Sequence, residues 1–213
     1  MQFGGKPIEI ANNRIYNCAY MPIDDTTAFS ESMFLLLGGT GVGYSVQKHH
    51  VKDMSPIVPK VGKNITYTIP DSIEGWSYAV QELIDSYFLN GCDITFDYGE
   101  IRPKGSPIKT SGGRAPGPLP LKHCIESVNN ILKELPEGHK LTPLQAHDIM
   151  CYIADAVLSG GIRRAAMISL FSADDKEMLT AKVGNWWETN PQRARANNSI
   201  VLRRDKVSKG FFE

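Results

Sequence analysis

Hydrophobic residues recur along the chain at two spacings, and these spacings predict alternating helices and strands. Apolar residues three and four positions apart predict helices over 28–37, 71–90, 119–135 and 142–159. Alternating or short apolar runs predict strands over 42–46, 65–69, 94–98, 166–171 and 199–202. Strands and helices that follow one another in this way predict an α/β fold, and no internal repeat interrupts the pattern.

Helix starts and connecting segments carry their own signals. Asp71 with Glu74 predicts one helix cap, and Thr142 followed by Pro143 and Gln145 predicts another. On the second of these helices, His147 and the aspartate after it are expected at the polar edge. Prolines and glycines over 51–70 predict a surface excursion, and residues 99–118 form a long loop.

Composition narrows the class of protein. The chain has 213 residues, of which 42% are hydrophobic and 22% are charged, as in a soluble globular protein with a real core. Lys plus Arg number 23 and Asp plus Glu number 23, so a basic nucleic-acid binder is disfavoured. No apolar run approaches the roughly 20 residues that span a bilayer, and the first residues lack the pattern of a signal peptide. The four cysteines form no CxxC motif or metal-binding pattern, which predicts a reducing, cytoplasmic location.

Four segments of the sequence contain residue types that could take part in catalysis or bind an anion. Cys18 lies in an apolar, strand-like setting, where a buried structural thiol is the alternative. Glycines over 38–43 would let backbone N–H groups approach an anion. Four cations over 102–114 suit a polyphosphate, unless this loop is simply solvated. The run 159–164 places two arginines before a strand, although its paired glycines also suit a helix end.

Taken together, these segments resemble one enzyme family, the adenosylcobalamin-dependent (class II) ribonucleotide reductases. The ribonucleoside-triphosphate reductase type is the most similar, and the resemblance covers nearly the whole chain in one order. It is carried by YNCAY at 16–20, GTGVGYSV at 39–46, DSIEGW at 71–76, IRPKG at 101–105, GGRAPGP at 112–118, GGIRR at 160–164 and NPQRARANNS at 190–199.

The resemblance implies a fold and a reaction. Residues 1–213 are expected to form one segment, about the first half, of a ten-stranded α/β barrel, with a small insertion at about 48–100. The family replaces the 2′-hydroxyl of a ribonucleoside di- or triphosphate by hydrogen, using adenosylcobalamin to generate a thiyl radical. A cysteine pair supplies two electrons and becomes a disulfide, which a thioredoxin-type protein or another dithiol reduces. Cys18 is expected to be one of these reducing cysteines.

The resemblance also implies roles for individual residues. Those expected to bind the ribonucleotide substrate are Asn17, Thr40, Gly41 and Arg163, the turn at Thr40 and Gly41 through backbone N–H groups on the phosphates and Arg163 on the base. Those expected to bind a deoxynucleotide effector are Asp24 or Asp25 at the sugar, Arg102, Ile108 and Lys109 in a first specificity loop, and Gly160 and Gly161 in a second.

Part of the family pattern is missing from this sequence. The Asn-x-Cys-x-Glu motif that holds the thiyl cysteine does not occur, since Cys124 and Glu126 have Lys122 where the asparagine should be. The radical half and most of the cobalamin site are therefore expected elsewhere, either in missing sequence or in a separately encoded chain. Two alternatives stay open, a reductase with a di-iron radical partner and an inactive deoxynucleotide-binding regulatory module. No nucleic-acid or membrane partner is expected.

Overall fold

The computed structural model describes residues 5, 9, 12–108, 113–159 and 166–211. Its strands are β1 (Cys18–Pro22), β2 (Gly41–Ser45), β3 (Asn64–Thr68), β4 (Asp93–Asp97), β5 (Met167–Ser172) and β6 (Ala196–Val201). Its α-helices are α2 (Thr27–Leu37), α3 (Lys48–Val51), α4 (Ile73–Phe88), α5 (Leu119–Lys133), α6 (Pro143–Ser159), α7 (Lys176–Thr180) and α8 (Trp186–Thr189). Short 3-10 turns are η1 (Asn12–Ile15), η2 (Pro191–Arg195) and η3 (Lys209–Phe211).

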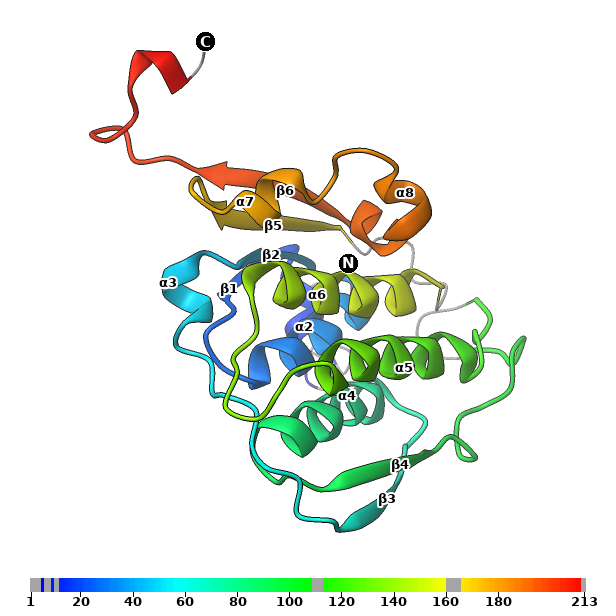
Figure 1. The fold of residues 1–213 in the computed structure, drawn as a ribbon. Helices are drawn as coiled ribbons and strands as arrows, with labels where there is room; N and C mark the ends of the chain where they lie inside the picture. Colours follow the sequence, from blue (N-terminus) through cyan, green and yellow to red (C-terminus); the bar gives the residue numbers. More distant parts are fainter. Residues whose placement is uncertain (1–4, 6–8, 10–11, 109–112, 160–165, 212–213) are drawn as a thin grey trace.

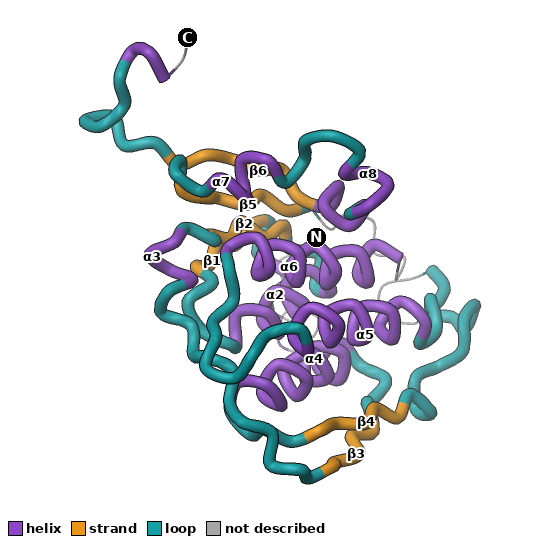
Figure 2. Tube along the Cα trace, in the orientation of Figure 1, coloured by secondary structure: helices purple, strands orange, loops and turns teal. Residues whose placement is uncertain are grey.

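The elements form stacked layers, which Figure 1 shows from top to bottom. A four-stranded parallel sheet in the order β1-β2-β5-β6 packs one face on α2 and α6. Helices α4 and α5 form the next layer, and the two-stranded parallel sheet β3-β4 packs beside α4. The secondary-structure colours in Figure 2 show the same order of strand, helix, helix and strand layers. The predicted α/β fold class is confirmed, and the predicted strand positions are within a few residues of those observed.

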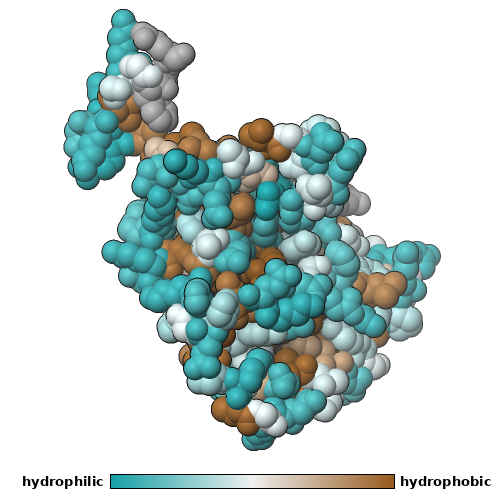
Figure 3. All heavy atoms as spheres, in the orientation of Figure 1, coloured by the Kyte–Doolittle hydropathy of each residue, from teal (hydrophilic) through white to brown (hydrophobic). Residues whose placement is uncertain are grey.

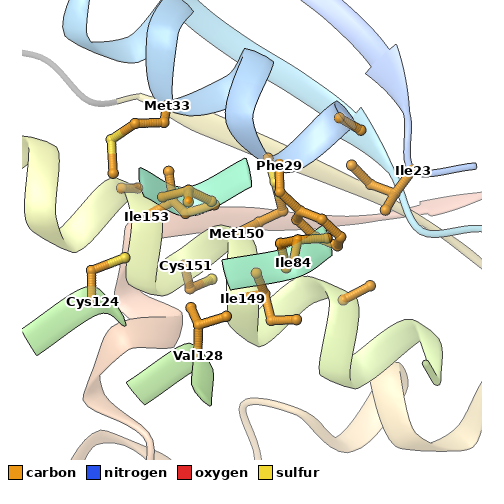
Figure 4. Packing of buried hydrophobic residues seen from close by; sticks show 14 of the residues in the cluster. Ile23, Phe29, Met33, Ile84, Cys124, Val128, Ile149, Met150, Cys151 and Ile153 are labelled. Carbon is orange, nitrogen blue, oxygen red and sulfur yellow. The ribbon is translucent and has the colours of Figure 1, made fainter. Parts of the chain in front are cut away.

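The hydrophobic core lies between the sheet and the two helical layers. Figure 4 shows side chains of α2, α4, α5 and α6 meeting there, among them Phe29, Ile84, Val128 and Ile149. Part of the predicted surface excursion also enters the core, because four of its apolar side chains are buried, whereas Val61 and Ile65 are exposed. The buried four are Val51, Met54, Ile57 and Ile69. The excursion is therefore packed onto the domain and not merely a loop over its surface.

The helix caps confirm one prediction and correct another. Thr142 Oγ1 accepts the N–H of Gln145 at 3.2 Å, and Gln145 Oε1 accepts the N–H of Thr142 at 2.9 Å, which is the reciprocal cap that the sequence predicts. At α4, however, the cap is Ser72, whose Oγ accepts the N–H of Gly75 at 2.9 Å. Asp71 is thereby left for an ion pair described below.

Helix α6 carries a buried polar contact with the sheet, which corrects the expectation for His147. This side chain is fully buried, and its Nδ1 lies 2.7 Å from the hydroxyl oxygen of Tyr44 on β2. Its Nε2 lies 3.6 Å from Sγ of Cys151, one helical turn further along. Burial raises the pKa of the Cys151 thiol to about 12 and lowers the pKa of His147 to about 4. His147 is therefore a neutral core residue that joins α6 to β2.

The face of the molecule drawn in Figure 3 is mainly polar. Figure 3 shows hydrophobic residues on one face in separate patches between hydrophilic ones. Among the described helices, none is both long enough and apolar enough to cross a membrane.

The neutral state of His147 gives the fold a specific pH dependence. Because the pKa of this side chain falls from 6.5 to about 4 on folding, the unfolded chain binds the proton first as the pH is lowered. We expect the free energy of unfolding to fall between pH 6.5 and pH 4, by about 3 kcal/mol from this group. Urea unfolding at several pH values measures the slope. In His147→Gln the slope should be smaller, and an unchanged slope in that variant would contradict the assignment.

Candidate functional site

The amino end of the parallel sheet brings together four of the residues predicted to bind substrate or to react with it. Cys18 opens β1 and is paired with Gly41, which opens β2. The N–H of Gly41 donates to the carbonyl of Asn17 at 2.9 Å, so the residue before Cys18 is fixed against β2. Thr40 is fully buried and its Oγ1 donates to the carbonyl of Tyr16 at 3.1 Å. The structure thus places Asn17, Cys18, Thr40 and Gly41 side by side.

The backbone N–H groups of this turn do not point to a ligand, which corrects the expected way of binding phosphate. The N–H of Thr40 donates to the carbonyl of Leu35 at 3.0 Å, and that of Gly41 is used by Asn17. Each group is already paired with a carbonyl, so neither is available to a phosphate without a rearrangement. Gly39, with φ of +91°, makes the left-handed turn that ends α2.

The sheet face that carries Cys18 is exposed. Its neighbours on this face include Tyr20 and Ile168, which are 57% and 41% exposed, whereas the alternate residues of the same strands pack on the helices. Gly43 lies between these two side chains, because a Cβ added there would meet Ile168 Cγ2 at 3.3 Å and Tyr20 Cδ2 at 3.6 Å. Parallel sheets are normally covered on both faces. This face is therefore expected to border a binding site or to be covered by a further structural layer.

Cys18 differs from the other three cysteines in accessibility. Cys92, Cys124 and Cys151 are at most 8% exposed, while Cys18 is exposed. Burial also raises the pKa of the Cys124 thiol to about 12, as it does for Cys151. A Cβ on Gly41 would lie 3.9 Å from Cys18 Sγ, so the glycine keeps the space beside the sulfur open. The structure excludes the alternative that Cys18 is a buried structural thiol.

The two candidate effector aspartates lie beyond the other end of β1. At roughly 3.3 Å per residue, β1 spans roughly 13 Å from Cys18 to Pro22, and both aspartates follow it. Asp25 lies just before α2, and its Oδ1 accepts the N–H of Thr27 at 2.7 Å and the Oγ1 hydroxyl of Thr27 at 2.6 Å. Asp24 is half-buried, and the pKa of His50 is lowered from its ordinary value by burial and by His49, an effect that the Asp24 carboxylate partly offsets. The candidate substrate and effector residues thus lie at opposite ends of one strand.

The predicted first specificity loop is organised by main-chain hydrogen bonds. The N–H of Ile108 donates to the carbonyl of Gly113 at 3.1 Å, and Pro107 forms an antiparallel bridge with Arg114. Arg114 Nη1 donates to the carbonyl of Gly105 at 2.9 Å. These contacts make a hairpin-like loop, so the alternative of an unstructured solvated loop does not describe its two sides.

Arg102 is held at the base of this loop. Its Nε donates to Asp71 Oδ2 at 2.5 Å, and both side chains are about one-third exposed. Since Ser72 caps α4, the Asp71 carboxylate is available to orient this guanidinium. Four other predicted residues, Lys109, Gly160, Gly161 and Arg163, lie outside the described residues.

Sequence reasoning missed the charged residues that join α6 to the segment before β6. Arg193 binds both oxygens of Asp148 through Nε and Nη2, each at 2.7 Å, and the two side chains are nearly buried. Arg195 Nε donates to Asp155 Oδ1 at 2.6 Å. Asp148 is therefore a buried partner of an arginine and not a residue at the polar edge. The seven-residue spacing of the two aspartates is a helical spacing that could have pointed to a common partner segment.

The described residues contain no metal site, and their one enclosed feature of note is a small cavity. No group of three or more His, Cys, Asp or Glu side chains among them is arranged to hold a metal ion. A cavity of about 300 Å³ lies between β4, α4 and α5, which is too small for a corrin ring. Its lining combines apolar and aromatic side chains with a polar rim, consisting of Leu83, Ile94, Phe96, Tyr98, Lys122, Ile125, Glu126 and Asn129.

Comparison with known proteins shows which family this chain is similar to. Residues 42–132 match the family described as B12-dependent ribonucleotide reductase, insertion domain. An adenosylcobalamin-dependent ribonucleoside-triphosphate reductase of Euglena gracilis is 38% identical over 144 residues, which cover 64% of this chain and 19% of the relative. The enzyme of the same name from Lactobacillus leichmannii is 33% identical over 211 residues, which cover 83% of this chain and 28% of the relative.

A solved structure supports the same relationship. The crystal structure of a B12-dependent (class II) ribonucleotide reductase matches with a TM-score of 0.75 and 25% identity, over 88% of this chain and 33% of that chain. The predicted resemblance and the predicted fold are confirmed. The chain spans only about a fifth to a third of the length of these proteins.

The exposure of Cys18 predicts selective chemical labelling. A maleimide added to the native chain should modify one thiol, Cys18, because the other three are buried; peptide mass spectrometry identifies the position. Gly41→Ala should slow this reaction, since its methyl group would lie beside the sulfur, while Gly210→Ala adds a methyl group in open space and serves as the control. Early labelling of a second cysteine, or equal rates in the two variants, would contradict this description.

Proposed function

The chain belongs to the family of B12-dependent (class II) ribonucleotide reductases over the part of their length that it spans, and from this premise we propose that it forms part of the catalytic barrel of such an enzyme. The proposed reaction converts ribonucleotides to 2′-deoxyribonucleotides. The observation that carries the proposal is the exposed Cys18 at the amino end of an open parallel sheet, beside a glycine that leaves space at its sulfur.

The proposed role of Cys18 is to supply reducing equivalents. In the reaction the 2′-hydroxyl leaves as water and a C2′–H bond forms, and this requires two electrons and two protons. Two thiols provide both when they become a disulfide. Cys18 would be one of them, and the second would come from the remaining length of the enzyme, because the other cysteines of this chain are buried away from the open face. A dithiol reductant must then reduce the disulfide.

The open sheet face suits a reaction that proceeds through a substrate radical. Once the rest of the enzyme covers this face, the space over Cys18 and Gly41 is closed to water, which would otherwise allow side reactions. Asn17, Thr40 and Gly41 would form the wall under the sugar and phosphates, and Arg163 would contact the base. The backbone N–H groups of Thr40 and Gly41 already donate to carbonyl groups. We therefore propose that other hydrogen-bond donors bind the phosphates.

Adenosylcobalamin is the proposed cofactor, because the similar reductases are named for their dependence on it. When bound, it supplies the radical that starts the reaction. Its binding is assigned mainly to the remaining length of the enzyme. These names favour cobalamin over the di-iron alternative. The predicted insertion at about 48–100 lies within the matched residues 42–132, and its exact limits stay a prediction. The cytoplasmic location also stays a prediction.

Arg102, Ile108 and Lys109, with Asp24 or Asp25 and the glycines at 160 and 161, are the proposed effector residues. Support comes from their position: the aspartates follow the end of β1 opposite to Cys18, and Arg102 is oriented by Asp71 at the base of the loop. A deoxynucleotide bound there would be distinct from the substrate. Such a separation is what an allosteric effector requires.

Cys18→Ser tests the catalytic proposal in the complete enzyme. We expect dithiol-dependent turnover to be lost while ribonucleotide binding is retained, because serine fills the same space but cannot form a disulfide. Cys92→Ser, which removes a thiol distant from the sheet, should keep turnover. Full activity of Cys18→Ser would refute the role of this residue. Effector binding in a protein that has no turnover even with Cys18 intact would instead support the regulatory module.

Arg102→Ala tests the effector site. Removing a charged hydrogen-bond donor should weaken deoxynucleoside triphosphate binding by about 1.5–3 kcal/mol, as measured by titration calorimetry. Arg203→Ala is the matched control, because Arg203 pairs only with Asp205 on an exposed segment. A binding isotherm of Arg102→Ala that overlays that of the wild type would remove Arg102 from the site.

A further inference from the structure

Strand β3 lies at the edge of its sheet. The sheet has two strands, and in Figure 1 β3 is at the bottom of the molecule, outside β4. The N–H of Asp93 donates to the carbonyl of Lys63 at 2.7 Å, and the N–H of Ile69 donates to the carbonyl of Asp97 at 2.9 Å. In a parallel pair, every second residue of a strand bonds to the neighbouring strand. The odd-numbered residues of β3 therefore direct their main-chain groups at β4.

The even-numbered residues of β3 point their N–H and carbonyl groups away from β4. They are Asn64, Thr66 and Thr68, and all three are exposed. Within the described part of the chain, no main-chain hydrogen bond outside the helices and strands uses these groups. A row of such groups is a template on which a further strand can form. β3 therefore presents three residues to which another strand can be added.

The usual protection against strand addition is almost absent from β3. Exposed edges are commonly protected by charged side chains, yet Lys63 is the only charged residue over 62–70. The residues over 65–68 are all β-branched or aromatic, which favours an extended strand. The opposite edge of the sheet differs, because β4 begins with Asp93 and ends with Asp97, and both are exposed. The edge that can accept a strand is therefore that of β3.

The sequence of this strand is symmetrical in character about Thr66. Gly62, with φ of +70°, lies four residues before it and Pro70 lies four residues after it, so the strand can extend equally far on both sides. Its nearest neighbours, Ile65 and Tyr67, are apolar, and the next two residues are polar. When such a strand pairs with its own copy in the antiparallel direction, apolar side chains meet on one face and polar side chains meet on the other.

We propose that β3 pairs with β3 of a second copy of this chain, in the antiparallel direction and about a twofold axis at Thr66. Each Thr66 then lies opposite its counterpart and Asn64 lies opposite Thr68, so the outward N–H and carbonyl groups of all three residues gain partners. Ile65 lies opposite Tyr67, which places a β-branched side chain beside an aromatic ring. Pairs of threonines, and pairs of this second kind, stabilise neighbouring strands.

The same register brings no like charges together and covers exposed apolar surface. Lys63 lies opposite Ile69, at the far end of the strand from the lysine of the other copy. Ile65, which is 38% exposed, is covered by the ring of Tyr67. That ring already packs on the hydrophobic core and meets Phe96 edge-on, with 6.1 Å between the ring centroids. The apolar face of the joined sheet is therefore continuous with the core of each copy.

The interface is formed by the same residues of both copies, so it is isologous and closes as a dimer. Two five-residue strands bury less surface than the roughly 1,200 Å² of a standard interface, and a weak, concentration-dependent dimer is therefore expected. This edge lies on the other side of the helical layers from Cys18. Dimer formation through β3 is therefore independent of the proposed function.

Sedimentation equilibrium of the purified 213-residue chain, over a series of concentrations, measures the dissociation constant of the dimer. Thr66→Lys and Thr66→Glu each place two like charges face to face at the axis. Thr95→Lys is the matched control, because Thr95 is the exposed partner of Thr66 on β4 and lies one strand further from the interface. Ile168→Lys tests the other exposed surface, the open face of the larger sheet. Thermal unfolding checks that each variant is folded.

We expect the wild-type chain to dimerise, and Thr66→Lys and Thr66→Glu to raise the dissociation constant about tenfold or more, because like charges that meet across an interface are strongly unfavourable. An equal mixture of these two variants should recover the dimer, since each axis then joins a lysine to a glutamate. Thr95→Lys and Ile168→Lys should dimerise as the wild type does.

A wild-type chain that stays monomeric at every concentration would overturn the inference. Equal effects of Thr66→Lys and Thr95→Lys would also overturn it, because they would indicate a general effect of charge. If the mixed Thr66 variants fail to associate, the twofold axis at Thr66 is excluded. Association that is lost in Ile168→Lys and kept in Thr66→Lys would assign the contact to the open face of the larger sheet.

Discussion

The arrangement of this domain depends on a parallel sheet that is covered on one face only. Along β1, β2 and β5, alternate side chains pack on α2 and α6, and the residues between them face outward. The parallel register then places Cys18 directly opposite Gly41 and leaves the sulfur accessible. A shift of β1 by one residue would turn the cysteine into the helical layer. The strand register that builds the core therefore also decides that Cys18 is exposed.

Helix α6 maintains this register from the covered side. Its buried His147 meets Tyr44 of β2, and its two aspartates bind arginines of η2 just before β6. Apolar contacts alone allow a helix to slide or rotate on a sheet, because they are not directional. A buried hydrogen bond and a bidentate ion pair each leave a polar group unpaired if the helix moves. We infer that these polar contacts select one position of α6 among several with similar apolar burial.

The sequence predicted what local periodicity determines and failed where distant partners decide. The strongly patterned helices and the Thr142 cap were predictable, since all their partners are a few residues away. His147 was assigned to a polar edge because periodicity carries no information on Tyr44, which is 103 positions away. The N–H groups at Thr40 and Gly41 suggested an anion site because their acceptors belong to other segments. The role of Cys18 as a reducing cysteine stays a prediction from the resemblance, to which the structure adds its exposure and its pairing with Gly41.

The distance between the candidate substrate and effector residues limits how the two sites can communicate. A strand such as β1 is fixed by its ladder of hydrogen bonds, so it cannot shift in response to a ligand without breaking its pairing with β2. Coupling requires an element with two arrangements of similar free energy, each preferred by one ligand state. Segments outside the ladder meet this condition more easily, because they can move while the sheet stays paired.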